Sequence, residues 1–289
     1  MHIERCIKSV KPLTSKIFIV DSFSTDNTGE KARSHGAMVI QRKWKNYADQ
    51  FQWGLDQFSN GSDWVMRLDA DEYLELDLQT EIPVLLESLA PDVLGVYIRR
   101  KVFFHGKWIK HGGFYPQTLL RIWRTGTGRI EQRWMDEHII LPPGAKTVYA
   151  KGHLVDDNHK SFTFWINKHN TYATREAIDQ LNIKHHFTAQ DQAIMTMNDV
   201  QANRKRILKK KVYSKLPAGL RAFMYFCYRY FIRLGFLDGA EGFVWHFMQG
   251  FWYRLLVDIK IDEIEKKSRG DIEKMREVIR RDHGIDLSQ

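Results

Sequence analysis

Two aspartates that close an apolar run are the strongest candidates for chemistry in this sequence. Asp69 and Asp71 follow residues 64–68, and the acid Glu72 comes directly after them. Because ionised carboxylates are almost never left unpaired inside a core, this pattern predicts a buried strand whose end opens onto a site. Carboxylates two positions apart leave the strand on one side, where they can share Mg²⁺ or Mn²⁺ and leave positions for phosphate oxygens. The alternative is a solvated acidic turn, because such short motifs also occur by chance.

A second apolar run also ends in an acid, and the two motifs together resemble a known family. Asp21 closes this run, and Ser22 opens a segment rich in helix-capping residues. Residues 19–28 and 64–72 together resemble the family 2 glycosyltransferases, which are inverting enzymes with a nucleotide-sugar-binding GT-A fold. The resemblance implies that Asp21 and Ser22 contact the nucleotide of a nucleotide-diphosphate sugar, while the two later aspartates hold the metal and the diphosphate.

The resemblance also implies a catalytic base. An inverting transfer needs one carboxylate that takes the proton of the acceptor hydroxyl as it attacks the anomeric carbon of the sugar. The family usually carries an acid followed by His or Asp at this place in the chain. Glu137, which precedes His138, is therefore the expected base, and Asp136 is the alternative. In a purely structural interpretation both acids pair with Arg133.

Three more side chains are candidates for the donor site. His153 lies where related enzymes sometimes supply a further metal contact, although a lone histidine is more often a hydrogen-bonded structural residue. Arg121 and Arg124 belong to an expected strand at residues 118–124, and their guanidinium groups suit phosphoryl oxygens. For each arginine the alternative is a surface side chain beside a strand.

The elements that must position these residues alternate between strands and helices. Strands are expected at 16–21, 38–40, 64–68, 95–98 and 118–124, and helices at 30–33, 51–58 and 78–90. This alternation predicts an α/β fold, with a mostly parallel sheet sandwiched by helices and a site at the carboxyl ends of the strands. The GT-A fold implied by the resemblance agrees with it, for a domain over residues 1–185. In that family a central strand precedes the helix at residues 3–10, so its neighbours are expected to lack a ladder partner here.

The C-terminal part of the chain differs in composition. Helical patterns replace the alternation from about residue 188, so residues 186–289 are expected to form a helical, membrane-associating region. Residues 204–211 hold six cations, and with the aromatic helices that follow they suit an anionic membrane surface. Nucleic acid is less favoured, because no zinc spacing, helix-turn-helix signal or aromatic RNA-binding motif accompanies them; a solvated basic face is the third interpretation. No segment reaches the roughly 20 apolar residues of a spanning helix, so interfacial helices are expected.

The cysteines and the N-terminus bear on the compartment, and the resemblance bears on the substrate. Cys6 and Cys227 match neither a disulfide framework nor a metal spacing, and no signal peptide is visible. We therefore expect a cytoplasmic protein, peripheral on the inner face of the plasma membrane. By resemblance to the lipopolysaccharide-core and polysaccharide branch, it is expected to move a hexose from a nucleotide-diphosphate sugar to a glycolipid or lipid-linked glycan, in lipopolysaccharide or capsule biosynthesis.

Two alternatives belong to other functional classes. The first is a catalytically inactive, membrane-associated scaffold derived from such an enzyme. The second is a phosphotransferase with an aspartate nucleophile at Asp69. Tyr73 disfavours the second, because such enzymes usually carry a threonine at that position, and Asp21 and Glu137 would have no role in it.

Overall fold

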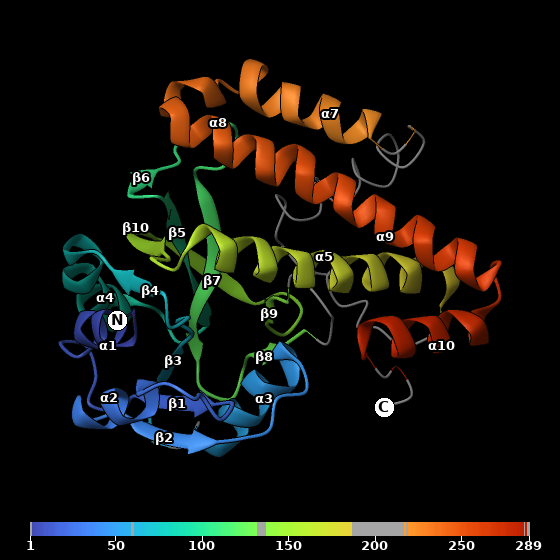
Figure 1. Ribbon diagram of the computed structural model, residues 1–289. Helices are drawn as coiled ribbons and strands as arrows, with labels where there is room; N and C mark the ends of the chain where they lie inside the picture. The colour runs from blue at the N-terminus through green and yellow to red at the C-terminus, as the bar shows by residue number, and fades with distance from the viewer. Residues whose placement is uncertain are drawn as a thin grey trace. The chain divides into compact units, whose positions relative to one another are not determined.

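The computed structural model describes residues 2–58, 61–131, 137–186, 217, 219–285 and 287. These residues form two compact units, an N-terminal unit that ends at His159 and a C-terminal unit that begins at Lys160. The N-terminal unit combines strands with helices, whereas the C-terminal unit consists of helices (Figure 1). The expected change from an α/β to a helical composition is confirmed.

A small parallel sheet lies near the start of the N-terminal unit. The elements around it are α1 (His2–Val10), β1 (Phe18–Asp21), α2 (Thr28–Ser34), β2 (Met38–Gln41) and α3 (Tyr47–Phe58). β1 and β2 pair in parallel, with α2 as the crossover that a parallel connection requires. Ile3 and Ile7 of α1 belong to one buried cluster with Ala32 and Ala37, because apolar residues three or four positions apart share one face of a helix.

A larger sheet of six strands carries the main core of this unit. Its strands are β3 (Trp64–Met66), β4 (Glu72–Leu74), β5 (Val93–Phe104), β6 (Lys107–Trp108), β7 (Gln117–Arg124) and β10 (Lys146–Asp157). The strand order is β3-β7-β5-β10-β4, with β6 beside β5. β5 and β10 run parallel, and the other pairs are antiparallel.

The α/β class is confirmed, but the larger sheet is mixed rather than mostly parallel. β5, β6 and β7 follow one another without an intervening helix, and such connections join antiparallel neighbours. β1 and β3 are edge strands of separate sheets in the described part of the chain. A short antiparallel pair, β8 (Arg129–Ile130) with β9 (Ile139–Ile140), lies between β7 and β10 in the sequence.

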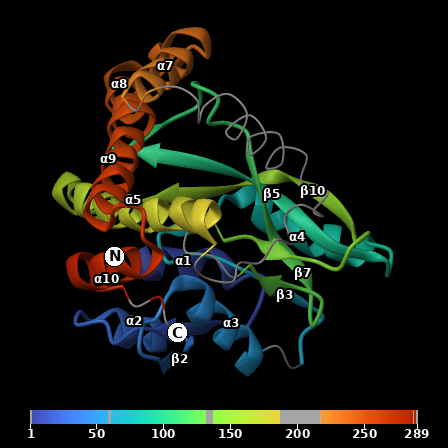
Figure 2. The same cartoon turned by 90° about the vertical axis from the view of Figure 1, so that its right-hand side faces the viewer.

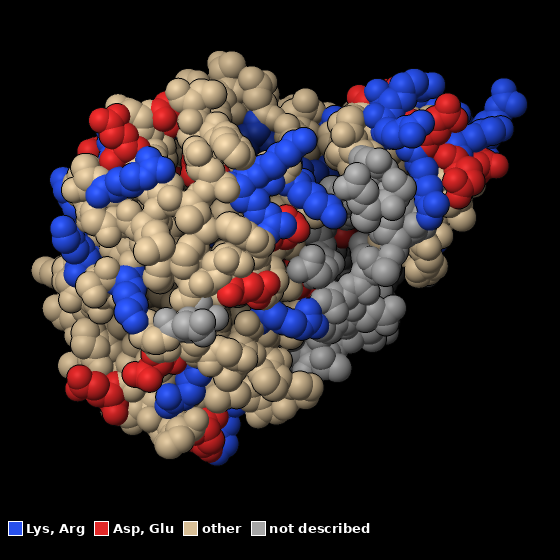
Figure 3. Space-filling view, turned by 90° about the horizontal axis from the view of Figure 1, so that it is seen from below, with Lys and Arg blue, Asp and Glu red and all other residues tan. Residues whose placement is uncertain are grey.

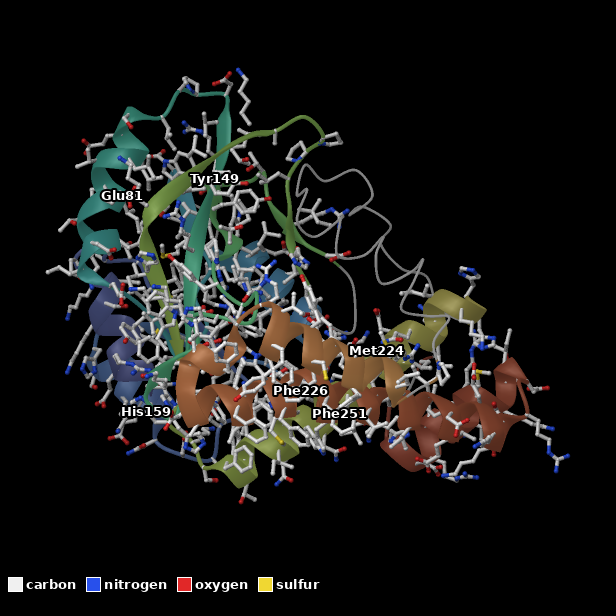
Figure 4. The ribbon with its side chains drawn as sticks, turned by 90° about the horizontal axis from the view of Figure 1, so that it is seen from above. Glu81, Tyr149, His159, Met224, Phe226 and Phe251 are labelled. Atoms are coloured by element: carbon white, nitrogen blue, oxygen red, sulfur yellow. The ribbon has the colours of Figure 1, made fainter. Side chains whose placement is uncertain are left out.

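One helix, α4 (Leu76–Ser88), packs closely against β10. Leu78 of the helix and Leu154 of the strand are fully buried in the same cluster. Gly152 is required at the closest approach, because a Cβ atom there would lie 2.6 Å from backbone atoms of Leu78. Glu81 of α4 accepts hydrogen bonds from the backbone N–H groups of Lys151 and Gly152, at 2.8 Å and 2.7 Å (Figure 4). These contacts fix the path of β10 just before it reaches the acidic residues described below.

Helices make up the C-terminal unit. They are α5 (Phe162–His185), α7 (Leu220–Cys227), η3 (Tyr228–Ile232), η4 (Gly235–Asp238), α8 (Gly239–Phe247), η5 (Met248–Trp252), α9 (Tyr253–Ser268) and α10 (Ile272–His283). α5 and α9 lie side by side in both views (Figures 1 and 2). Ile178 and Leu181 of α5 share a buried cluster with Ile264 of α9 and Ile279 of α10.

The position of α5 bears on the domain boundary. Because α5 buries its apolar residues against α9 and α10, it groups with the C-terminal helices, and that unit begins at Lys160. The boundary predicted between residues 185 and 186 would instead separate α5 from these partners, and it stays a prediction. The six cations of residues 204–211 lie outside the described residues.

A membrane-spanning helix is not found among the described helices, since none of them combines the length and the apolar character that crossing a bilayer demands.

Candidate functional site

Asp69 lies just beyond β3, beside one aromatic hydroxyl and two guanidinium groups. The hydroxyl of Tyr47 donates to Asp69 Oδ1 at 2.8 Å. Arg67 Nε lies 3.7 Å from the same oxygen, and Arg121 Nη2 lies 3.7 Å from Oδ2. Burial alone raises the pKa of Asp69, but Arg121 and Arg67 outweigh it and lower the pKa to about 2. Asp69 is therefore ionised at neutral pH, and 32% of its side chain remains exposed for a ligand.

Glu72 is the buried anchor of this acidic turn. Its Oε2 accepts the N–H of Asp69 at 2.9 Å, and its own N–H donates to the Asp69 carbonyl at 2.9 Å. Arg121 Nη2 lies 2.5 Å from Glu72 Oε1, and the two residues are only 3% and 1% exposed. Burial raises the pKa of Glu72, and Arg121 opposes that shift. Glu72 thus holds the turn in place, a role that its position beside the motif did not reveal.

A β-bulge brings Arg121 to this turn. Leu120 lies opposite Tyr97 and Ile122 lies opposite Val96, so Arg121 is an extra residue in β7. A bulge of this kind turns a side chain away from the regular alternation of a strand. Nε and Nη1 of Arg121 are buried and have no hydrogen-bond partner within the described residues. Arg121, the candidate phosphate-binding residue, therefore contacts the carboxylates of Asp69 and Glu72 and keeps two N–H donors, Nε and Nη1, that can bind an anion.

Asp71 has a different set of neighbours, at the end of β10 and on α1. Asn158 Nδ2 donates to Asp71 Oδ2 at 2.9 Å, and the N–H of Asp157 donates to the Asp71 carbonyl at 3.3 Å. Arg5 of α1 pairs with Asp157 at 2.7 Å, and it also donates to the Asp71 carbonyl at 3.4 Å. His159 Nε2 lies 2.6 Å from Asp157 Oδ2. No motif in the sequence pointed to Asn158 or Arg5 as the residues that position Asp71.

The chemistry of Asp69 and Asp71 fits a hard divalent cation. Both residues offer carboxylate oxygens, and Asp69 stays ionised far below neutral pH. Mg²⁺ and Mn²⁺ prefer oxygen ligands, and Mg²⁺ keeps positions for water or phosphate. The buried, unpartnered donors of Arg121 suit a phosphate bound beside such a cation.

His153 lies beside Asp77, Glu75 and Tyr115 rather than beside the two aspartates with which the sequence grouped it, and its metal contact stays a prediction. Its Nδ1 lies 3.1 Å from Asp77 Oδ2 and 3.7 Å from Glu75 Oε2, and its Nε2 lies 2.8 Å from the hydroxyl of Tyr115. The β4–β10 register explains the separation. Asp156 pairs with Glu72 in that register, so His153 lies three residues, or about 10 Å, further along the strand.

The group around His153 is itself a possible cation ligand set. Ligand atoms of Glu75, Asp77 and His153 all lie within 4.8 Å of one another, and among the described residues no other three such side chains do. Lys101 Nζ already lies 2.6 Å from Glu75 Oε2, so a lysine neutralises one of the acids. These residues form a hydrogen-bonded cluster without a free carboxylate at Glu75.

Asp21 and Ser22 close β1 and are held by their own loop. Asp21 accepts the Ser24 N–H at 3.1 Å and the Gln41 Nε2 at 3.0 Å. Burial alone raises the pKa of Asp21, but the hydrogen bonds from Ser24 and Gln41 outweigh it and lower the pKa. Ser22 Oγ accepts from Gln50 Nε2 of α3 at 2.7 Å. The two residues shape the loop after β1, and their contact with a nucleotide stays a prediction.

Arg67 connects the Asp69 turn to the segment that carries Glu137. Nη1 of Arg67 donates to the Glu137 carbonyl at 3.2 Å, while its Nε faces Asp69. The guanidinium also lies over the Tyr47 ring, with 4.7 Å between its carbon and the ring centroid. One side chain therefore contacts both the predicted metal ligand and the main chain of the predicted base. Asp136, the alternative base, lies outside the described residues.

Comparisons with known proteins agree with these motifs. The family model described as Glycosyl transferase family 2 matches residues 2–198. An uncharacterized glycosyltransferase of Rickettsia typhi is 28% identical over 94% of this chain and 86% of its own length. The lipopolysaccharide core biosynthesis glycosyltransferase LpsC of Rhizobium meliloti is 28% identical over 62% of this chain and 67% of its own length.

One solved structure is similar over most of the chain. The crystal structure of S. aureus TarS 1–349 covers 98% of this chain and 88% of its own, with a TM-score of 0.43 and 13% sequence identity.

Proposed function

Because this chain belongs to glycosyl transferase family 2, we propose that it is an inverting, metal-dependent hexosyltransferase. Its donor is a nucleotide-diphosphate sugar, and its acceptor is a glycolipid or lipid-linked glycan of the bacterial cell envelope. The relative LpsC, named for lipopolysaccharide core biosynthesis, supports this class of acceptor. The phosphotransferase alternative has no support from the family match.

The contact of Arg67 with both Asp69 and the Glu137 segment carries this proposal. Glu137 follows Asp69 by 68 positions, and the sequence alone predicts their roles separately. In the fold one guanidinium reaches a carboxylate oxygen of Asp69 and the main chain of Glu137. A transferase needs its donor ligand and its base within reach of one sugar, and this link supports such an arrangement.

Asp69 and Asp71 would hold Mg²⁺ or Mn²⁺ together with the donor diphosphate. The cation would neutralise the charge that develops on the leaving diphosphate. Arg67 and Arg121 keep Asp69 ionised, so its oxygens are available without loss of a proton. Asn158 orients Asp71, and the two unpartnered donors of Arg121 would bind a phosphate oxygen. Asp21 and Ser22 would contact the nucleotide through the loop after β1.

Glu137 would take the proton of the acceptor hydroxyl as that oxygen attacks the anomeric carbon. The new bond forms on the face opposite the diphosphate, which leaves with the electron pair of the broken bond, so the configuration inverts. Arg67 fixes the main chain of Glu137 and thereby the starting point of its side chain. Asp136 remains the alternative base.

We place the enzyme in the cytoplasm, at the inner face of the plasma membrane. A nucleotide-diphosphate sugar is a cytoplasmic compound, and a lipid-linked acceptor is reached at the membrane surface. Both cysteines, Cys6 and Cys227, are free thiols, which suits a reducing compartment.

A transfer assay with matched acid-to-amide variants tests the proposal. Nucleoside diphosphate release is measured from uridine, guanosine and thymidine diphosphate hexoses, with extracted envelope glycolipids as acceptors. Glu137→Gln should lower kcat by about 10²–10⁴ and leave the KM for the donor unchanged, because only proton transfer is lost. Asp71→Asn should abolish transfer, whereas Glu87→Gln, at an exposed acid of α4, should have no effect.

Two results would overturn the proposal. Equal turnover by Asp71→Asn and the unchanged chain would remove Asp71 from the mechanism. Absence of transfer and of donor binding in a folded chain would favour the inactive scaffold.

A further inference from the structure

The helical hairpin of residues 219–252 turns apolar side chains toward solvent. It comprises α7, η3, η4, α8 and η5, and we refer to it as the apolar hairpin. Six of its exposed apolar side chains, each 46–72% exposed, are Phe223, Met224, Phe231, Ile232, Leu237 and Phe243. Contiguous exposed apolar side chains of this kind mark an interaction surface rather than ordinary surface variation.

Three charged side chains of the apolar hairpin, Arg221, Arg229 and Asp238, point the other way. Arg221 donates through Nε to Asp258 of α9 at 2.8 Å, and its Nη2 bonds the other oxygen. Arg229 is only 4% exposed, and Asp238 is 2% exposed and lies 3.8 Å from the fully buried His246. A surface that faces water has the opposite arrangement, with charged side chains exposed and apolar side chains buried. Burial of an ion costs free energy, and an apolar side chain left in water contributes no hydrophobic stabilisation. The outer face of the hairpin is therefore suited to an apolar environment.

The length of the hairpin favours a position in the membrane interface. α7 and η3 run on as one segment of 13 residues, which spans about 20 Å at 1.5 Å per residue. The hydrocarbon core of a bilayer is about 30 Å thick. Phe223, Met224, Phe231 and Ile232 recur at helical spacing along this segment, so its apolar side is continuous. Such a helix lies in the headgroup layer with its apolar side down.

The surrounding charges favour an anionic lipid surface over a protein partner. Arg233 is exposed between Ile232 and Leu234 at the end of η3, where it can meet a lipid phosphate while its neighbours enter the acyl boundary. The chain is also strongly basic just before the hairpin, with six cations in residues 204–211. Where α9 meets α10, by contrast, acidic and basic side chains alternate and pair, as in Lys266–Asp262 and Lys267–Glu263 (Figure 3). That end has the mixed charge of a solvated surface.

We propose that the apolar hairpin is the membrane-docking element of this chain and inserts its outer face into the headgroup layer of an anionic bilayer. Figure 4 looks down on this hairpin, with Met224 and Phe226 of α7 and Phe251 of η5 labelled. This inference rests on the proposed function, since it specifies how an enzyme with a lipid-linked acceptor reaches its membrane. Beyond the proposed function, this inference names the residues that contact the membrane and states that these residues recognise anionic lipids.

Vesicle co-sedimentation of the full chain tests the proposal. The vesicles consist of phosphatidylcholine alone or with 30 mol % phosphatidylglycerol. We expect binding to the anionic vesicles, and at least a tenfold loss of partitioning in the triple variant Phe231→Ser, Ile232→Ser, Leu237→Ser, because three exposed apolar side chains no longer enter the lipid. Arg233→Gln should weaken binding about fivefold, the equivalent of about 1 kcal/mol for one cation near an anionic surface.

A matched control removes exposed apolar side chains elsewhere. Leu76 and Val84 of α4 are 73% and 69% exposed, so Leu76→Ser, Val84→Ser should bind vesicles like the unchanged chain. Equal binding by the triple variant, or no binding by the unchanged chain, would overturn the proposal. A dimer in sedimentation velocity that the triple variant abolishes, without vesicle binding, would assign the face to a second copy and also overturn it.

Nucleotide titration of the same proteins in solution separates this inference from the proposed function. Nucleotide binding without vesicle binding refutes only the docking element. Vesicle binding without nucleotide binding refutes only the proposed transferase.

Discussion

Removal of the Arg121 guanidinium should destabilise the N-terminal unit more than loss of any exposed arginine. In Arg121→Met, Glu72 would stay 1% exposed and keep Arg100, at 3.8 Å, as its remaining cation. Loss of one partner from a buried ion pair costs about 3–5 kcal/mol, because it leaves an uncompensated charge. Asp69 adds little to this cost, since about a third of its side chain is in solvent and Arg67 still faces it. We therefore expect a loss of about 3–4 kcal/mol in the free energy of unfolding.

Urea unfolding followed by near-ultraviolet circular dichroism measures this loss, with Arg124→Gln as the matched control. Arg124 lies on the same strand, but it donates to the carbonyl of Val93 at 3.0 Å and pairs with no buried acid in the part of the chain that the structure describes, so its loss should cost about 1 kcal/mol. The double variant Glu72→Gln, Arg121→Met should recover about 2 kcal/mol, because no buried charge is left unpaired. Equal destabilisation by Arg121→Met and Arg124→Gln, without recovery in the double variant, would show that Arg121 and Glu72 are not coupled as a buried ion pair.

The pH dependence gives an independent check on the same pair of acids. The pKa of Asp69 is lowered from 3.8 to about 2, so its stabilisation is complete above 3.8 and is lost only as the pH falls toward 2. Asp69 in the unchanged chain therefore contributes no change in stability between pH 5 and 8. Without Arg121 the pKa values of Asp69 and Glu72 rise. Burial already raises the pKa of Glu72 to about 8 in the unchanged chain, and a carboxyl with a raised pKa in the folded state contributes less stability as the pH rises. Arg121→Met should therefore lose more stability between pH 5 and pH 8 than the unchanged chain does.

Three further changes have expected outcomes of their own. Gly152→Ala should lower the thermal midpoint, with a loss of about 2 kcal/mol, because its Cβ would meet the Leu78 backbone at 2.6 Å; Gly29→Ala, with no atom nearer than 3.5 Å, should be neutral or slightly stabilising. His153→Ala should retain metal-dependent nucleotide binding in a calorimetric titration, since His153 pairs with Asp77 and Glu75 rather than with Asp69 and Asp71; loss of binding would support its predicted metal role. Arg67→Lys should lower kcat at least tenfold, because an ammonium group cannot span Asp69 and the Glu137 carbonyl; unchanged kcat would disprove that link.

The sequence predicted those features that local patterns determine. Capping residues after Asp21 and the apolar run before Asp69 marked the ends of β1 and β3, and alternating elements indicated the α/β class. Strand direction could not be predicted in the same way. The partner of each strand is chosen by long-range packing, and the connection from β5 to β7 lacks the helix that a parallel crossover needs.

Some features of the site could not be predicted from the sequence because they depend on contacts between residues that are far apart in the chain. Glu72 and Arg121 are 49 positions apart, and their pairing depends on a bulge that no local pattern announces. His153 was expected with Asp69 and Asp71 because related enzymes sometimes supply a further metal contact at this place in the chain. The β4–β10 register decides its position, and it places Asp156 instead of His153 beside Glu72. His153 is thus three residues along β10 from the position that faces Glu72, and this offset separates it from Asp69 and Asp71.

The most direct test of the central claim is calorimetric titration of the purified chain with uridine diphosphate, with and without Mn²⁺. We expect saturable binding that requires the metal, is lost in Asp69→Ala and in Asp71→Ala, and persists in the control Asp77→Ala. Guanosine and thymidine diphosphates would be titrated in the same way, because the loop after β1 does not specify the base. If the folded chain binds none of the three nucleotides, or if Asp69→Ala and Asp71→Ala bind as well as the unchanged chain, the two aspartates do not form a donor site.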